Sequence, residues 1–194
     1  MHTACMESGF RPLKSRVDLG GWPPQNRSMS DSNQELRVEI RGLMLDPSSN
    51  VPIVILRDIQ SQLFLPIWIG VFEANAIALK IEGVEPPRPM THDLLRLMLE
   101  QLGGQVEKIV ISDLKESTFF AVIHVQQGGR SIGIDARPSD AIALALRAEA
   151  PIFVLRSVLD KAQAAELATD ATDEERLKKW LEEINPEELG KWTM

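Results

Sequence analysis

The chain has 194 residues, 44% hydrophobic and 25% charged, which is the composition of a globular protein. No apolar run approaches membrane-spanning length, and the single cysteine, Cys5, excludes an internal disulfide, so we expect a cytoplasmic protein without a membrane segment. The net charge of −7 lies mainly at the C-terminal end, where residues 157–194 contribute −5. This charge distribution argues against tight nucleic-acid binding through a broad basic surface, but it is compatible with a local site that uses a metal ion or a few arginines.

The N-terminal residues 1–34 are rich in Gly, Pro, Ser and Asn and show no sustained apolar period. Such a composition is typical of a flexible leader. Met29 is a candidate for the true start, because regular patterning begins only a few residues later. The intact mass of the native protein would test this.

The first patterned region predicts three strands and a helix. Leu36, Val38 and Ile40 alternate with charged residues, which indicates a half-buried strand. Two apolar strands are expected at Pro52–Arg57 and Leu63–Ile69, the latter at a sheet edge or bulged because Pro66 cannot donate to a ladder. A helix over Phe72–Glu82 ends at Gly83.

The second patterned region repeats this order after an additional helix. Thr91 is expected to cap that helix, whose apolar stripe consists of Leu94, Leu95, Met98, Leu99 and Leu102. The expected strands are Val106–Leu114, Thr118–Gln126, Ser131–Ile134 and, last, Ile152–Leu155. The strand at Ser131–Ile134 leads directly into a helix that begins near Pro138 and is apolar nearly all round, as in a buried helix.

The C-terminal region, residues 162–194, is predicted to be an acidic helical tail. A first helix follows Ser157, and a second spans Thr172–Ile184, with Glu175 at capping-box spacing from Thr172. The second helix has an apolar stripe, which either packs on the same domain or serves as a separate interaction element.

An internal repeat is visible when the chain is compared with itself at an offset of 65 residues. Six residues of the first half coincide with six identical residues of the second half: Ile67, Ile69, Ala76, Ile77, Ala78 and Leu79 with Ile132, Ile134, Ala141, Ile142, Ala143 and Leu144. Each half is then three strands plus a helix, although two buried alanine-rich helices can also match by chance. Because runs of strands precede each helix, we expect one α+β domain with a mainly antiparallel sheet and packed helices.

Four motifs together resemble the bifunctional nuclease domain family. They are EANAIAL (Glu73–Leu79), PMTHDLL (Pro89–Leu95), FFAVI (Phe119–Ile123) and IDARPSDAIALALRAEAPIFV (Ile134–Val154). The resemblance covers residues 36–161 and places the domain at 35–161. It implies a compact α+β domain that forms homo-oligomers. It also implies a nuclease, that is a hydrolase, with DNase and RNase activity and low sequence specificity.

Candidate chemistry centres on the strand-to-helix junction at Asp135, Arg137 and Asp140. A metal-dependent nuclease needs carboxylates to hold Mg²⁺ or Mn²⁺, and here Asp135 and Asp140 are the candidate ligands. Arg137 can stabilise charge on the phosphoryl oxygens. Equally open is a structural role, in which Asp140 offsets the helix dipole and Arg137 pairs with one of the aspartates. The repeat alignment sets Asp135 against Gly70 and Arg137 against Phe72, which favours these two as the functional pair.

Two further candidates lie at the other helix starts. His92 is a candidate general base or metal ligand, and Glu73 a candidate third carboxylate. Their structural alternatives are a local hydrogen bond for His92, beside an Asp93 that satisfies the helix start, and dipole compensation for Glu73. His124 is expected to be a core or rim histidine with its hydrogen bonds satisfied. Trp68 and Phe72 are expected to pack in the core or at a subunit interface.

Two functions therefore remain open from the sequence. The first is metal-assisted hydrolysis of phosphodiester bonds in DNA and RNA, with weak, non-specific nucleic-acid binding. The second is a non-catalytic oligomeric binding or regulatory domain for an anionic ligand or a protein partner. The negative charge of the tail repels nucleic acid and is unfavourable for the first.

Overall fold

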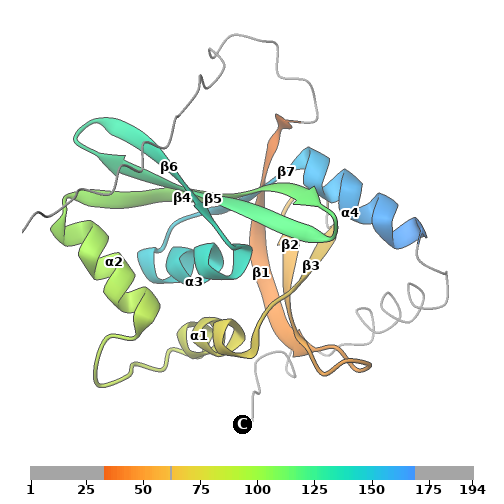
Figure 1. The fold of residues 1–194 in the computed structure, drawn as a ribbon, viewed down its shortest axis with the longest axis horizontal. Coiled ribbons are helices and arrows are strands. Elements are labelled where there is room, and N and C mark those ends of the chain that lie inside the picture. The colour runs from red at the N-terminus through yellow and green to blue at the C-terminus, as the bar shows by residue number, and fades with distance from the viewer. Residues whose placement is uncertain (1–32, 62, 169–194) are drawn as a thin grey trace, which may run out of the picture.

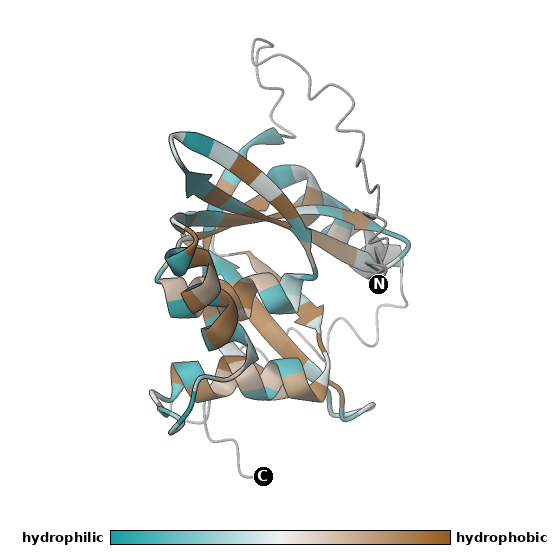
Figure 2. Cartoon of the chain, turned by 60° about the vertical axis from the view of Figure 1, so that its left-hand side comes forward, coloured by the Kyte–Doolittle hydropathy of each residue, from teal (hydrophilic) through white to brown (hydrophobic). Residues whose placement is uncertain are grey.

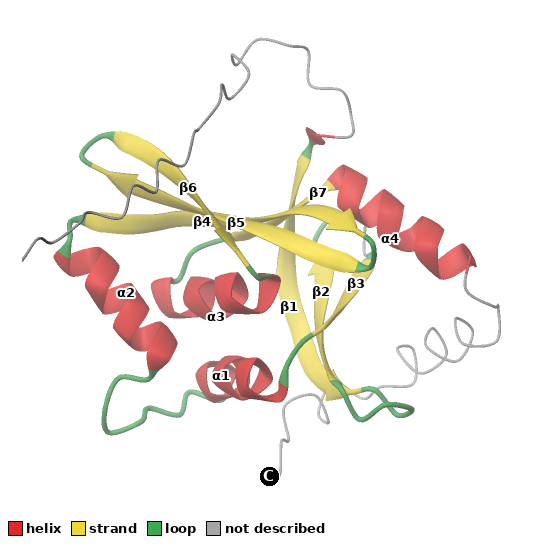
Figure 3. Ribbon diagram, in the orientation of Figure 1, coloured by secondary structure: helices red, strands yellow, loops and turns green. Residues whose placement is uncertain are grey.

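The computed structural model describes residues 33–61 and 63–168, which contain four helices and a seven-stranded sheet (Figures 1 and 3). The strands are β1 (Glu35–Leu45), β2 (Pro52–Asp58), β3 (Phe64–Trp68), β4 (Gly104–Lys115), β5 (Thr118–Gln127), β6 (Arg130–Ala136) and β7 (Ile152–Leu155). Met29 and the expected helix Thr172–Ile184 lie outside the described residues.

The sheet has the order β3-β2-β1-β7-β4-β5-β6, with antiparallel pairing everywhere except between β4 and β7. The expected mainly antiparallel α+β fold is thus confirmed. Pro66 lies in β3, which is an edge strand as its missing N–H predicts. The opposite edge, β6, pairs with β5 in one unbroken register from Arg130 to Ala136.

The internal repeat corresponds to two antiparallel meanders on either side of β7. One contains β1, β2 and β3 and continues into helix α1 (Val71–Ile81), and the other contains β4, β5 and β6 and continues into α3 (Pro138–Ala148). The helix starts align two positions away from the sequence match, because Gly70 and Arg137 are the two N-cap residues. Asp140 therefore corresponds to Glu73, the third residue of α1, and not to Asn75.

Helix α3 is the centre of the core. Its residues Ala141–Ala145 are completely buried, as the continuous apolar run predicts. Helix α1 packs on α3 and β2, and α3 packs on β4 and β5. Because α1 and α3 pack on one another, the first turns of the two helices are brought together on one side of the strands (Figure 1).

Helix α2 (Thr91–Gln101) differs from the sequence expectation in two ways. The helix begins after Met90, so Thr91 is the first helical residue and the cap bond comes from Asp93, whose carboxylate accepts the Met90 N–H at 2.9 Å. No residue of α2 is buried, and Leu94, Met98 and Leu102 remain about half exposed or more. Figure 2 brings this side of the molecule forward. The expected stripe thus packs only in part.

Helix α4 (Arg156–Ala168) contacts β4 and β7, away from the other three helices (Figure 1). Val158 and Leu159 anchor it in the main hydrophobic core. The expected helix after Ser157 is therefore present, and the domain boundary placed after residue 161 lies inside it. In the described part of the chain, no helix is long and apolar enough to cross a membrane.

Candidate functional site

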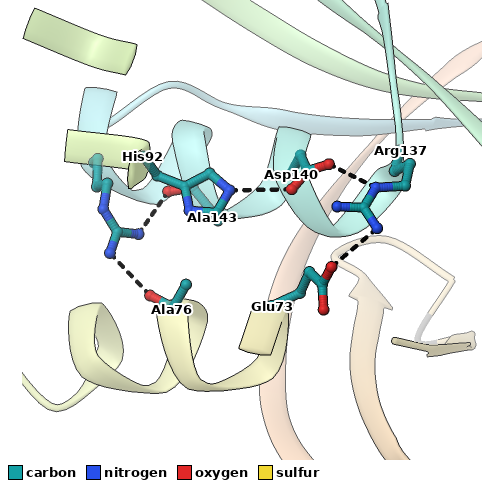
Figure 4. A network of polar contacts seen from close by, with 7 residues as sticks. Glu73, Ala76, His92, Arg137, Asp140 and Ala143 are labelled. Atoms are coloured by element: carbon teal, nitrogen blue, oxygen red, sulfur yellow. Dashed lines mark hydrogen bonds and ion pairs between the residues drawn. The ribbon is translucent and has the colours of Figure 1, made fainter. Parts of the chain in front are cut away.

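Four polar side chains from three helix starts form one connected chain of contacts (Figure 4). Arg137 lies in the middle, with its NH1 2.9 Å from Glu73 Oε1 and its Nε 2.8 Å from Asp140 Oδ2. The second carboxylate oxygen of Asp140 lies 3.1 Å from His92 Nε2. All four are candidates from the sequence, where they lie at three separate helix starts, and the fold brings them together.

Local sequence explains how Arg137 and Asp140 are placed. Strand β6 ends at Ala136, and Arg137 has the extended backbone of an N-cap residue immediately before Pro138. Proline begins the helix without losing a hydrogen bond, since the first N–H groups of a helix have no partner within it. Asp140 then lies in the first turn, where the helix dipole favours a carboxylate.

Glu73 reaches Arg137 because its side chain folds back over Gly70. A methyl group added at residue 70 would collide with the Glu73 carboxylate, although the backbone there is open to any residue. The absence of a side chain at Gly70 therefore gives the carboxylate its place. This observation goes beyond dipole compensation, the structural role considered for Glu73.

The ionisation of Asp140 determines which ring nitrogen of neutral His92 carries the proton. Burial raises the pKa of Asp140, but the hydrogen bonds from Arg137 and His92 outweigh this, and the net pKa lies below 3.8. At neutral pH the carboxylate can therefore only accept, so His92 Nε2 must carry the proton. In neutral His92 the lone pair is then on Nδ1, which leaves that atom able to accept a proton.

The cluster combines an accessible cation with a more enclosed histidine. The Arg137 side chain is 66% exposed, whereas that of His92 is 12% exposed. The carboxylates of Asp140 and Glu73 raise the pKa of Arg137 and hold its guanidinium in place. Such an arrangement suits recognition of an anion beside a group that can transfer a proton.

Asp135 lies apart from the cluster. It pairs with Val122 in the β6–β5 register, whereas its neighbour Ile134 pairs with Ile123, which belongs to the buried core. Since successive strand residues point to opposite faces, Asp135 faces away from the core that contains α3. Among the described residues, its carboxylate makes no hydrogen bond or ion pair.

The expected metal ligands, Asp135 and Asp140, are therefore not brought together. In the described residues, no three His, Cys, Asp or Glu side chains form a group that could hold a metal ion. The carboxylates that do approach one another, Glu73 and Asp140, are both engaged by Arg137. As placed here, these residues do not fit a bound divalent ion.

Sequence reasoning missed Arg147, which underlies the cluster. Its side chain is only 5% exposed and contacts Asp93 through Nε at 2.6 Å. The signal was present, because a single arginine in an otherwise apolar, buried helix requires partners. Asp93 had been considered, but only for the helix start.

The other aromatic and histidine candidates lie elsewhere. Phe72 is 87% exposed and Trp68 is 50% exposed, so neither packs in the core of this chain, and packing at a subunit interface stays the expectation for both. His124 lies in β5 opposite Lys108, where burial and the nearby lysine lower its pKa. A pocket of about 330 Å³ lies between β1 and the C-terminal ends of α1 and α3, and its lining includes Ile81 and Leu146.

Comparison with known proteins agrees with the four sequence motifs. The sequence profile of the bifunctional nuclease domain matches residues 54–166, more than half of the chain. The chain belongs to this family. The match begins within β2 and ends within α4, so it includes all four residues of the cluster.

Relatives of this bifunctional nuclease domain protein occur in bacteria and plants. An uncharacterized protein of Mycobacterium tuberculosis is 41% identical over 163 residues, which is 78% of this chain and 96% of the relative. Bifunctional nuclease 2 of Oryza sativa subsp. japonica is 29% identical over 122 residues, 61% of this chain and 38% of the plant protein. Bifunctional nuclease 1 of Arabidopsis thaliana is 25% identical over 116 residues, 58% and 36% respectively. Family membership and the plant relatives support a nuclease-like role.

Proposed function

We propose that this protein hydrolyses phosphodiester bonds in DNA and RNA with low sequence specificity, at the cluster formed by Glu73, His92, Arg137 and Asp140. The observation that supports it most is the contact chain itself, in which an exposed arginine and a histidine share one carboxylate. A nucleic-acid substrate is implied by the family.

The proposed roles follow from the geometry. Arg137 binds a phosphate of the backbone, because a guanidinium offers paired N–H donors to phosphate oxygens. His92 Nδ1 takes a proton from the attacking water, and Asp140 holds the imidazole in that tautomer. Glu73 fixes the orientation of Arg137 through the 2.9 Å ion pair.

Assistance by Mg²⁺ or Mn²⁺ is a separate proposal that comes from the family resemblance. Such an ion would polarise the phosphate and activate water. Asp135 was expected to be a ligand of that ion, but it lies outside the cluster, and the roles proposed above do not use it. Both are tested independently of the four clustered residues.

The deciding experiment is a cleavage assay on single-stranded and duplex DNA and on RNA, with EDTA or with added Mg²⁺ or Mn²⁺. His92→Gln and Asp140→Asn should lose activity under every condition that supports the wild type, while Lys80→Gln, on the exposed C-terminal end of α1, should not. Full activity of both cluster variants would contradict the assignment. Activity in EDTA would contradict only the metal.

The alternative is a non-catalytic domain that binds an anionic ligand through Arg137. It predicts thermal stabilisation by an anion such as inorganic phosphate without metal or turnover. A clean preparation that cleaves no substrate under any condition, and is stabilised in this way, would favour it over the nuclease. Arg137→Gln should abolish that stabilisation.

We also propose that the protein assembles with a second copy of itself through β6. This edge strand lacks two of the usual protections, a bulge and a proline: its register with β5 is unbroken, and Ile132 and Ile134 are each 41% exposed. In a twofold antiparallel pairing centred on Gly133, Ile132 of one copy lies opposite Ile134 of the other, and Ser131 lies opposite Asp135. The strand is thus self-complementary.

Light scattering after size-exclusion chromatography tests this assembly. Ile132→Lys with Ile134→Lys should give a smaller species, because paired lysines would face one another across the twofold axis. Val84→Lys, a change of an equally exposed residue outside β6, is the control. An unchanged mass for the double variant would contradict an interface at β6.

A further inference from the structure

Helix α2 carries His92, yet apolar packing holds this helix only in part. None of its residues is fully buried; Leu99 packs against the core, but most of its other apolar side chains remain largely exposed. Its only contacts with other elements by polar side chains, within the described residues, are at its first turn, through His92 and Asp93. At its C-terminal end, Gln127 donates to the Leu102 carbonyl. The position of His92 therefore depends on a few polar bonds in addition to this partial packing.

The shortest of these bonds comes from Arg147. This side chain lies between three helices, and each of its donor groups is used. Nε donates to Asp93 of α2 at 2.6 Å, NH2 to the Ala76 carbonyl of α1 at 3.0 Å, and NH1 to the Ala143 carbonyl of α3 at 2.9 Å.

Asp93 transmits this contact to the start of α2. One of its carboxylate oxygens accepts from Arg147, and the other accepts the backbone N–H of Met90, the N-cap residue. The adjacent residue, His92, reaches Asp140 on α3. Two neighbouring residues of α2 are thus tied to positions 140 and 147 of one rigid, buried helix. Two such points fix both the place and the rotation of the first turn of α2.

We propose that Arg147 is a positioning residue, which holds the first turn of α2 through Asp93 so that His92 reaches Asp140. This inference rests on the proposed function only where it gives His92 a chemical role. Arginine is required because its planar fork presents donors in three directions, whereas lysine is a point charge on a flexible chain. Arg147→Lys should therefore keep the contact with Asp93 but not all three hydrogen bonds.

The first test needs no activity. The chain contains three histidines, His2, His92 and His124, so the ring signals of His92 in an NMR spectrum are assigned by their loss in His92→Gln. The spectrum of Asp140→Asn gives the chemical shifts of the His92 ring when its contact with residue 140 is altered. Arg147→Met and Asp93→Asn should move the His92 signals toward those shifts, and Arg147→Lys should move them less.

The control for this test is Glu100→Gln, which alters the Arg96–Glu100 ion pair farther along the same helix. The His92 signals should not change in this variant. Unchanged His92 signals in Arg147→Met would overturn the proposal. If Arg147→Met does not fold, unchanged signals in both folded variants, Asp93→Asn and Arg147→Lys, would overturn it equally.

The second test is a double-variant comparison in the cleavage assay. Arg147→Lys should lower kcat about tenfold with little change in KM, since a small displacement of a catalytic group lowers the rate of the chemical step. Added to His92→Gln, it should cause no further loss. Independent, additive losses would mean that Arg147 does not act through His92. If His92→Gln cleaves as well as wild type, the proposed function fails, while the NMR comparison still decides the role of Arg147.

Discussion

His92 Nε2 and Asp140 Oδ1 lie 3.1 Å apart although 48 residues separate them in the sequence. The contact joins the first turns of α2 and α3. It makes Asp140 the common partner of a histidine and an arginine, since Arg137 Nε binds the other carboxylate oxygen at 2.8 Å. The predictions that follow concern this cluster and the helices that support it.

Replacement of Asp140 should affect activity far more than replacement of Asp135. Asp140→Asn removes the charge that orients both Arg137 and His92, and we expect kcat to fall by about 10²-fold, the lower range for general acid–base catalysis. Asp135→Asn, two residues before Arg137 and outside the cluster, should retain activity close to wild type. Steady-state kinetics on one oligonucleotide will show the difference. Equal losses in the two variants would mean that the site extends to the other face of β6.

Gly70→Ala should reproduce the effect of Glu73→Gln. The added methyl group takes the space of the Glu73 carboxylate, while the backbone at residue 70 suits alanine. Both variants should therefore lose the ion pair with Arg137 and show a raised KM, with a melting temperature within a few degrees of wild type. A wild-type KM for Gly70→Ala, with a raised KM for Glu73→Gln, would contradict this placement of the carboxylate.

Stability should fall as the pH falls below about 4. Burial raises the pKa of Asp58, but hydrogen bonds from the side chain and backbone of Ser61 outweigh it. Burial likewise raises the pKa of Asp93, but hydrogen bonds from the Met90 backbone and from Arg147 outweigh it. Both pKa values therefore lie below 3.8. A carboxyl group whose pKa is lower in the native state than in the unfolded state stabilises the fold at pH values above its unfolded-state pKa. This stability is lost as the pH falls through its native-state pKa. Urea unfolding between pH 7 and pH 2 measures this. Asp93→Asn should reduce the slope below pH 4, and an unchanged slope would exclude Asp93 as a contributor.

Helices α3 and α2 should respond very differently when a leucine side chain is shortened to alanine. Leu144 in α3 is completely buried, and Leu144→Ala should cost about 2–5 kcal/mol in the free energy of unfolding. Leu94 in α2 is 52% exposed, and Leu94→Ala should cost less than about 1 kcal/mol. Chemical denaturation of the two variants gives both values. Similar losses would show that α2 is covered in solution, for example by a second copy.

Local features of the chain were predictable from the sequence. The junction of β6 and α3 depends on Pro138 and an apolar run, and the edge position of β3 depends on Pro66, so each follows from neighbouring residues. The internal repeat correctly predicted two similar halves. It did not predict that β7 separates them, because the pairing of β7 with β1 and β4 depends on contacts distant in the chain.

The candidate site was only partly predictable for the same reason. Helix N-termini identified Glu73, His92 and Asp140 as polar residues at helix starts, but their convergence depends on how α1, α2 and α3 pack. The emphasis on Asp135 came from an alignment that is two positions out of step at the helix starts. Arg147 was missed because the buried run around it was interpreted only as apolar packing.

The central position of β7 also has a consequence for how the protein folds. This strand is the last of the sheet in the chain, yet it lies between the two meanders and pairs with a strand from each. During synthesis, β1 and β4 therefore expose unpaired inner edges until residues 152–155 have left the ribosome. The halves of the sheet cannot join before almost the whole domain has been made, and a chain that stops before Ile152 would present two open edges to other proteins.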